Sequence, residues 1–291
     1  MAGLTSHLSH QALRGPLCLA LVAALLSGCS INLGSLTPSS EPEPPKLTSQ
    51  SNIASLSETI KNNPNDPQAY NMRGAVLAQA GKTDEALADF NKAISIDANY
   101  GQAYANRGLV YRQTRHLDQA MADYERAIAL DANYAPAYLG RGLVYKARKQ
   151  PTEALADFNK VIALAPDNAE AYYNRGLLYQ GEKQHQYAID DFTVASGLVP
   201  QQAEPLLARA LSYLAIDKTR EAAADLDEAV QDDPQNAQAW LTRGLAYERL
   251  GEKNKAAGSY GRAINLRPRD EAARTGFARV GGKPGQPYDT F

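Results

Sequence analysis

A repeat of 34 residues constrains this chain more than any other feature of its sequence. When the sequence is shifted by one period, five glycines and one alanine fall into register, and so do six alanines (Gly74, Gly108, Gly142, Gly176, Ala210, Gly244; Ala86, Ala120, Ala154, Ala188, Ala222, Ala256). Six units follow without insertion or deletion, starting at residues 67, 101, 135, 169, 203 and 237. Such a period predicts a solenoid, because one short unit can bury its apolar face only against its neighbours.

Each unit carries two apolar stripes with helical spacing. With positions in a unit numbered 1 to 34, an aromatic residue or Leu at 4, a small residue at 8 and Leu or Tyr at 11 share one helix face. Ala at 20, an aromatic residue or Leu at 24 and Ala or Val at 27 define a second helix, and Pro at 32 ends it in the last four units. The small residue at 8 lets the two helices approach closely. The unit is therefore predicted to be a helical hairpin.

These residues resemble the tetratricopeptide repeat (TPR) family, whose pattern has an aromatic residue at 4, Gly at 8, Tyr at 11, Ala at 20, an aromatic residue at 24, Ala at 27 and Pro at 32. The resemblance covers units 67–100, 101–134, 135–168, 169–202, 203–236 and 237–270. It implies an all-α, right-handed solenoid of six hairpins. Helical patterns at 52–62 and 271–280 predict capping helices for the two end faces, so the solenoid is expected to span residues 52–280.

Charged residues recur at two positions in a way that departs from the family pattern. Position 7, commonly Leu in the family, is Arg in all six units, and position 23 is Asp in the first five (Arg73, Arg107, Arg141, Arg175, Arg209, Arg243; Asp89, Asp123, Asp157, Asp191, Asp225). Both positions flank a buried stripe, so we expect a structural ladder of half-buried ion pairs. Pairing within units would leave Arg243 opposite Ser259, whereas pairing with the preceding unit would leave Arg73 opposite Ser55; we favour pairing within units. A row of ligand-binding arginines is the alternative.

On the first helix of each unit, positions 2, 5, 9, 12 and 13 face away from the core stripe, and in units three to six positions 5 and 9 are apolar. In the family this face lines a peptide-binding groove, and here its candidate residues come from units three to six (Leu139, Leu143, Tyr173, Leu177, Leu207, Leu211, Leu241, Leu245). Because the core stripe is already assigned, we expect this strip to be covered by a protein or peptide partner, by the tail or by a second copy in a homodimer. Tyr173 is the best single anchor. Tyr173→Ala with Leu207→Asp is expected to abolish capture while melting changes little.

The N-terminal region predicts export and lipidation. Residues 1–28 read as a signal peptide, with an apolar run from Leu17 to Leu26 that is too short for a permanent membrane helix. The sequence Leu26-Ser27-Gly28-Cys29 resembles the lipobox of bacterial lipoproteins, which implies lipidation of Cys29. Ser30 rather than Asp after it implies an outer-membrane anchor facing the periplasm. An ordinary cleaved signal is the alternative. Residues 29–51 are predicted to be a Ser/Pro-rich tether and 281–291 a flexible tail.

The sequence offers little for catalysis. The two histidines of the predicted mature chain, His116 and His185, lie in different units, so we expect no metal site, no cofactor and no enzyme activity. The net charge of −2 and the lack of a recognisable basic stripe argue against nucleic-acid binding. The resemblance implies a periplasmic scaffold or adaptor for an envelope protein, such as a protease or a cell-wall hydrolase. A pilotin-like lipoprotein that escorts secretin or pilus subunits is the alternative, and an enzyme a remote one.

Overall fold

The computed structural model describes residues 49–288, which form 14 α-helices and no strand. Helix α1 (Ser49–Asn62) stands alone at the start and α14 (Glu271–Arg279) at the end. The first helices of the six units are α2 (Pro67–Gln79), α4 (Gly101–Gln113), α6 (Ala135–Ala147), α8 (Ala169–Gly181), α10 (Ala203–Ala215) and α12 (Ala237–Arg249). The second helices are α3 (Thr83–Ile96), α5 (Leu117–Leu130), α7 (Pro151–Leu164), α9 (His185–Leu198), α11 (Thr219–Asp232) and α13 (Lys253–Leu266).

Local sequence accounts for where some of these helices begin and for the turns inside the hairpins. The side chains of Asn168 and Asn236 each accept a hydrogen bond from a backbone N–H in the first turn of α8 and α12, which satisfies a donor that the helix itself cannot pair. Position 15, in the turn inside each hairpin, has positive φ in all six units (Gly81, Arg115, Lys149, Lys183, Asp217, Gly251). Only two of these residues are glycines, so four units hold the turn in a conformation that is unfavourable for a residue with a Cβ.

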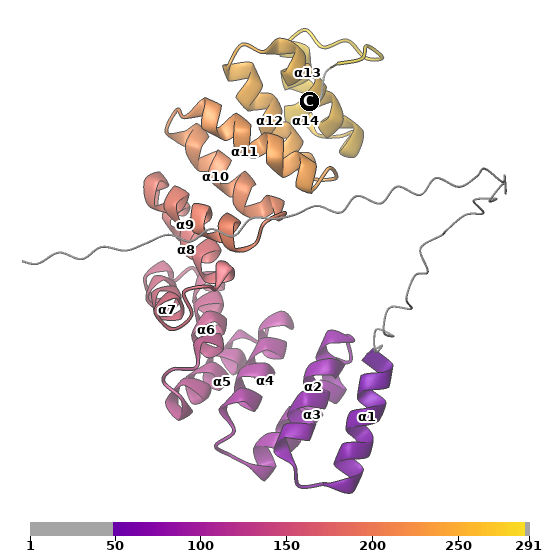
Figure 1. The fold of residues 1–291 in the computed structure, drawn as a ribbon, viewed down its shortest axis with the longest axis vertical. Coiled ribbons are helices and arrows are strands. Elements are labelled where there is room, and N and C mark those ends of the chain that lie inside the picture. Colours follow the sequence, from indigo (N-terminus) through magenta and orange to yellow (C-terminus); the bar gives the residue numbers. More distant parts are fainter. Residues whose placement is uncertain (1–48, 289–291) are drawn as a thin grey trace, which may run out of the picture. The chain divides into compact units, whose positions relative to one another are not determined.

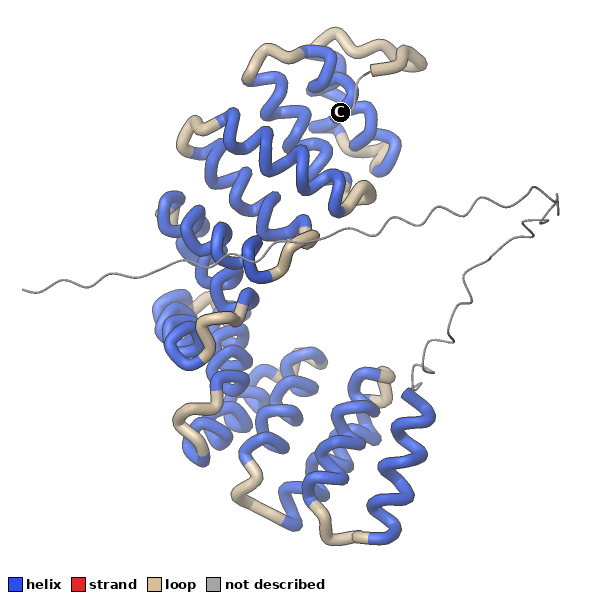
Figure 2. Tube along the Cα trace, in the orientation of Figure 1, coloured by secondary structure: helices blue, strands red, loops and turns tan. Residues whose placement is uncertain are grey.

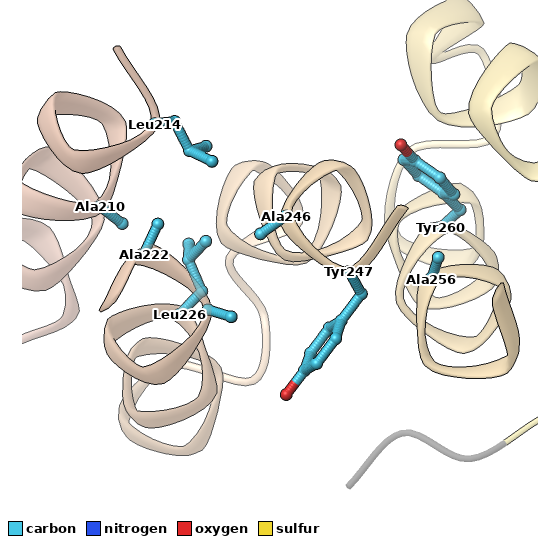
Figure 3. Packing of buried hydrophobic residues seen from close by; sticks show 9 residues of the cluster. Ala210, Leu214, Ala222, Leu226, Ala246, Tyr247, Ala256 and Tyr260 are labelled. Carbon is cyan, nitrogen blue, oxygen red and sulfur yellow. The ribbon is translucent and has the colours of Figure 1, made fainter. Parts of the chain in front are cut away.

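Five of the six hairpins are held together by a glycine packed against an aromatic ring, and unit five has Ala210 and Leu226 at the same two positions. A Cβ added to Gly74 would lie 2.8 Å from the ring of Phe90, and one added to Gly176 would lie 2.7 Å from the ring of Phe192. The alanines at position 20 are completely buried in all six units. Figure 3 shows the buried alanines of units five and six together with the larger Leu226 and Tyr260 at position 24. Small residues thus bring the helices close, and the large residue at position 24 fills the remaining space.

Successive hairpins stack in chain order, as expected for a solenoid. Every helix contacts the next one along the chain, and the first helix of a unit also contacts the first helix of the next unit, as α4 does with α6 and α10 with α12 (Figures 1 and 2). The predicted all-α solenoid of six hairpins is confirmed. Helix α1 begins three residues earlier than the sequence pattern suggested, and its Ile53 and Ile60 pack at the start of the stack.

Candidate functional site

The arginines at position 7 pair with the aspartate at position 23 of their own unit. In the first five units Nε and Nη2 of the arginine donate to the two carboxylate oxygens, at 2.6 to 2.9 Å (Arg73 with Asp89, Arg107 with Asp123, Arg141 with Asp157, Arg175 with Asp191, Arg209 with Asp225). This two-pronged geometry matches the guanidinium plane to the carboxylate. The hydrogen bonds to aspartate raise the pKa of all five arginines. The register is therefore within units.

Three of these arginines also connect their unit to the one before it. Nη1 of Arg107 donates to Asn91 at 2.6 Å, Nη1 of Arg175 to Asn159 at 2.7 Å, and Nη1 of Arg209 to Thr193 at 3.1 Å. The three acceptors all stand at position 25 of the preceding unit. Each guanidinium thus joins two second helices in successive hairpins. This arrangement supports the structural role of the ladder rather than a row of ligand-binding arginines.

In the sixth unit the arginine at position 7 pairs with a carboxylate of the preceding unit instead of one in its own unit. Arg243 is 1% exposed and has Ser259, not Asp, at position 23. Its Nη1 donates to the Ser259 hydroxyl at 2.7 Å, and its Nε donates to Asp227, at position 25 of unit five, at 2.6 Å. Tyr247 lies beside this pair and donates its hydroxyl to the second oxygen of Asp227 at 2.7 Å. The sequence analysis did not identify Asp227. The available signal was an aspartate at position 25 of unit five, directly before the one unit that lacks Asp at position 23.

The strip of eight apolar residues at positions 5 and 9 is more buried than expected. Only Leu211 is exposed, at 40%, while the other seven are half-buried. The ring of Tyr173 lies 5.8 Å from that of the core residue Phe192, and Leu207 packs against the buried clusters of units five and six. The assumption that the strip lies apart from the core is therefore wrong for Tyr173 and Leu207, which already pack inside the solenoid. Tyr173→Ala with Leu207→Asp would remove packing between helices, so it is not a clean test of binding.

The parts of the strip that remain accessible line three separate hollows along the first helices. The first hollow, of about 190 Å³, lies between α4 and α6 and includes Leu139 and Leu143. The second, of about 730 Å³, lies at the start of α8 and α10 and includes Tyr173. The third, of about 450 Å³, lies between α10, α12 and α14 and includes Leu211, Leu241 and Leu245. Leu177 and Leu207 lie on the same face but line none of the three.

Two tyrosines reach these hollows from the second helices. Tyr124 lines the first hollow and Tyr260 the third, and both stand at position 24, where units one, three and four have Phe. In each case the ring lies against a glycine at the sixth residue after the end of its unit, Gly140 in α6 or Gly276 in α14. Tyr260 donates its hydroxyl to Glu248 at 2.6 Å, and Glu248 also pairs with Arg279, which lowers the pKa of that carboxyl. This contact is visible in the sequence, because each tyrosine at position 24 is followed 16 residues later by a glycine.

Polar side chains that the apolar pattern did not identify also belong to this face. Arg112 lines the first hollow, and its Nε is buried without a hydrogen-bond acceptor among the described residues. Lys146 stands one unit further along, and its Nζ donates to Asn174 at 2.8 Å; burial lowers the pKa of this amine. Glu170 lines both the first and the second hollow, and Glu204 lines the second. The groove face therefore combines apolar contact with charges of both signs at the first hollow, where Arg112 and Glu170 lie, and with carboxylates at the second.

Several other expectations concern segments away from the groove face. Cys29, the signal peptide and nearly all of the tether lie outside the described residues. Residues 281–288 form a hydrogen-bonded turn against Phe277 and line none of the three hollows, so this part of the predicted flexible tail does not cover the groove face. Within residues 49–288, no three His, Cys, Asp or Glu side chains are grouped as metal ligands, and no helix has the length and hydrophobicity to cross a membrane.

Comparison with protein families finds matches along most of the solenoid. Models described as TPR or tetratricopeptide repeats match residues 56–88, 74–114, 101–134, 144–182 and 207–273, which together make up more than half of the chain. The comparison with curated proteins finds no match.

Solved structures show the same fold at low sequence identity. PilF of Pseudomonas aeruginosa is 22% identical, with a TM-score of 0.67 over 73% of this chain and 97% of that one. YrrB, described as a TPR protein with an unusual peptide-binding site, is 22% identical, with a TM-score of 0.51 over 64% of this chain and 96% of that one. MamA is 25% identical, with a TM-score of 0.52 over 56% of this chain and 95% of that one.

Proposed function

Because the chain belongs to the tetratricopeptide repeat family, we propose that it is a non-catalytic scaffold that holds a helix or an extended peptide of a partner protein along its first helices. The family and the fold are typical of protein–protein interaction. The observation that carries the proposal is the third hollow, where the exposed Leu211 lies beside the half-buried Leu241 and Leu245. Leucines that are already partly covered lose little conformational freedom on binding, so their remaining surface contributes efficiently to affinity.

The rim of the third hollow supports the recognition of a peptide rather than a wholly apolar ligand. Gln238, Glu271 and Thr275 surround the leucines and supply donors and acceptors for a peptide backbone. The first and second hollows extend the same face over units two to five, which gives room for several anchoring side chains. We expect the partner to place apolar residues in the hollows and polar residues on the rims between them.

Substituting Leu211 is the direct test of this site. Leu211→Asp places a charge in the third hollow without removing a core residue, so partner capture is expected to fall by about tenfold with little change in melting. Val194→Asp is the matched control, because Val194 is 39% exposed but lies on the second helix α9, outside the hollows. A photo-crosslinking residue at position 211 should trap a discrete partner in intact cells, whereas one at position 194 should not. Equal crosslinking at both positions would refute the groove.

We also propose that the scaffold is anchored in the bacterial envelope, at the outer membrane and facing the periplasm, through lipid on Cys29. The support is the lipobox at Leu26 to Cys29 directly after the apolar run, followed by a Ser/Pro-rich segment long enough to act as a tether. In that setting the partner is an envelope protein, such as a protease or a cell-wall hydrolase.

The anchor predicts a specific change in fractionation. Full-length protein is expected in the membrane fraction, because two or more acyl chains give stable attachment, and Cys29→Ala should move it to the soluble fraction or leave it mislocalised. Cys18→Ala is the control, since Cys18 lies within the apolar run and is removed with the signal. Recovery of the wild-type chain entirely in the soluble fraction would show that Cys29 is not an anchor.

A further inference from the structure

Positive charge is concentrated at the C-terminal end of the solenoid. Residues 253–288 contain eight Lys and Arg but only two Asp and Glu, whereas residues 49–252 contain 20 Lys and Arg against 27 Asp and Glu. The small net charge of the whole chain hides this asymmetry. The sequence analysis recognised no basic stripe, but the cations are concentrated in one continuous part of the stack, from α13 through α14 to the following turn.

Most of these cations have no acidic partner within the described residues. Lys255 pairs with Glu252 and Arg279 with Glu248. The other six form no ion pair within residues 49–288 (Lys253, Arg262, Arg267, Arg269, Arg274, Lys283). The arginines of the ladder, in contrast, are all matched by carboxylates. Unmatched cations are available to an acidic partner without breaking an internal pair.

Three of the unmatched cations surround an apolar hollow, which we call the end hollow. It has a volume of about 480 Å³ and lies between α13, α14 and the turn after α14, with Arg262, Arg274 and Lys283 on its lining and Phe277 and Ile264 as apolar contacts. Helix α14 separates it from the third hollow, because Glu271, Thr275 and Arg279 line that hollow while Arg274 and Phe277 line this one. The end hollow is therefore a different site from the groove face.

The turn after α14 gives the end hollow a defined wall. Gly281 has φ of 81° and ends the helix, and Gly282 lies against the ring of Phe277, where a Cβ would not fit. Gly285 has φ of 80° after Pro284 in a turn closed from Gln286 N–H to Lys283 C=O at 3.2 Å. The glycines and proline that suggested a flexible tail are thus the residues this turn requires.

Aromatic packing holds the turn on the helix. Tyr288 accepts a hydrogen bond from the Lys283 N–H at 2.6 Å, and its ring meets that of Phe277 edge to face, with centroids 5.8 Å apart. Lys283 is thereby kept near Arg262 and Arg274 on the lining of the end hollow. Two fixed aromatic rings and three cations therefore face the same space.

We propose that the end hollow binds an acidic peptide segment that carries an apolar side chain. The apolar side chain enters between Phe277, Ile264 and Tyr288, and neighbouring carboxylates meet Arg262, Arg274 and Lys283. A hollow with an apolar floor and cations on its lining suits a discrete side chain flanked by acids, whereas a flat anionic membrane needs only surface charge. This site is independent of the proposed groove and allows the scaffold to hold two partners, or two segments of one partner.

The proposal is tested by selecting, from a displayed library of random decapeptides, those that bind the full-length protein. Wild-type protein is expected to enrich peptides with Asp or Glu beside Leu, Ile or Phe, and Arg262→Glu with Arg274→Glu should weaken binding of the enriched peptides by about tenfold or more. Lys92→Glu with Arg220→Glu is the matched control, because it makes the same change in net charge at exposed positions of α3 and α11. Leu211→Asp should leave this binding unchanged, which separates the end hollow from the groove.

Three outcomes would overturn the proposal. One is that the enriched peptides share no consensus of acidic and apolar residues, or that their binding does not depend on Arg262 and Arg274. Another is that the control pair weakens binding as much as the end-hollow pair, which would show a general charge effect. The third is that vesicles containing phosphatidylglycerol, or a single-stranded oligonucleotide, depend on the two arginines while the peptides do not. Loss of peptide binding when apolar residues in the enriched peptides are replaced by Ser would support the role of Phe277 and Tyr288.

Discussion

Asp227→Ala is expected to lower the free energy of unfolding by about 3 to 5 kcal/mol, because it leaves a buried guanidinium without its carboxylate. Arg243 is 1% exposed, and the Nε to carboxylate distance is 2.6 Å. The Ser259 hydroxyl and the rings of Trp240 and Tyr247 remain beside the charge, but none of them carries a negative charge. The hydroxyl of Tyr247 also loses its acceptor. Urea unfolding followed by circular dichroism measures the effect.

Asn91→Ala is the matched control at the same repeat position. Asn91 accepts from Nη1 of Arg107 at 2.6 Å, but Arg107 keeps both hydrogen bonds to Asp123, so the loss is expected to be about 1 kcal/mol. If Asp227→Ala costs no more than Asn91→Ala, then Arg243 does not depend on a carboxylate in the preceding unit. Arg243→Met should be better tolerated than Asp227→Ala, because it removes the charge and keeps most of the volume.

The contrast between these two positions shows what the repeat could and could not reveal. Periodicity predicts a contact well when the same residues recur, so the paired Arg and Asp at positions 7 and 23 were visible in five units. In the sixth unit the contact is kept by an exchange, with Asp227 taking the place of an aspartate at 259. A search for identical residues in register does not find an exchange of this kind. A carboxylate near Arg243 that replaces the missing Asp at position 23 is the feature that identifies Asp227.

The partial burial of the strip at positions 5 and 9 has a different cause. Helical periodicity gives the direction in which Tyr173 and Leu207 point, but it does not say how far the neighbouring helices extend over them. Tyr173 packs on Phe192 of its own unit, whereas Leu207 contacts clusters shared between units five and six. The hairpins and their order followed from local pattern. Which leucines stay accessible depends on the angle between neighbouring helices, which the pattern does not contain.

The turn after α14 illustrates the same limit for loops. Glycine and proline indicate flexibility when nothing holds the chain, but the same residues are required where φ is positive, as it is at Gly281 and Gly285. Tyr288 decides between these two interpretations, because its hydroxyl and ring tie the turn to Phe277. A single aromatic residue after a Gly/Pro segment was therefore the useful signal.

Gly140→Ala is expected to destabilise the solenoid by about 1 to 3 kcal/mol, although alanine is normally the better helix former. A Cβ at this position would overlap the ring of Tyr124 and would lie 2.6 Å from its hydroxyl oxygen. Gly140 is buried within α6, so neither the backbone nor the ring can move away without disturbing the contact between units two and three. Gly181→Ala is the control, because nothing lies within 4 Å of a Cβ at the end of α8. Thermal unfolding of both variants makes the comparison.

A double-mutant cycle assigns this cost to the tyrosine. The Tyr124 ring lies 3.2 Å from a Cβ built on Gly108, whereas the phenylalanine rings of units one, three and four lie 2.7 to 2.8 Å from a Cβ built on their own position-8 glycine. Tyr124→Phe removes the hydroxyl oxygen that would lie 2.6 Å from the alanine Cβ, so a small shift of the ring leaves room for alanine, as Phe192 does beside Ala208. Gly140→Ala with Tyr124→Phe is therefore expected to recover most of the lost stability. Additive losses in the double variant would mean that the glycine is required for the backbone approach of α5 and α6, not for the tyrosine.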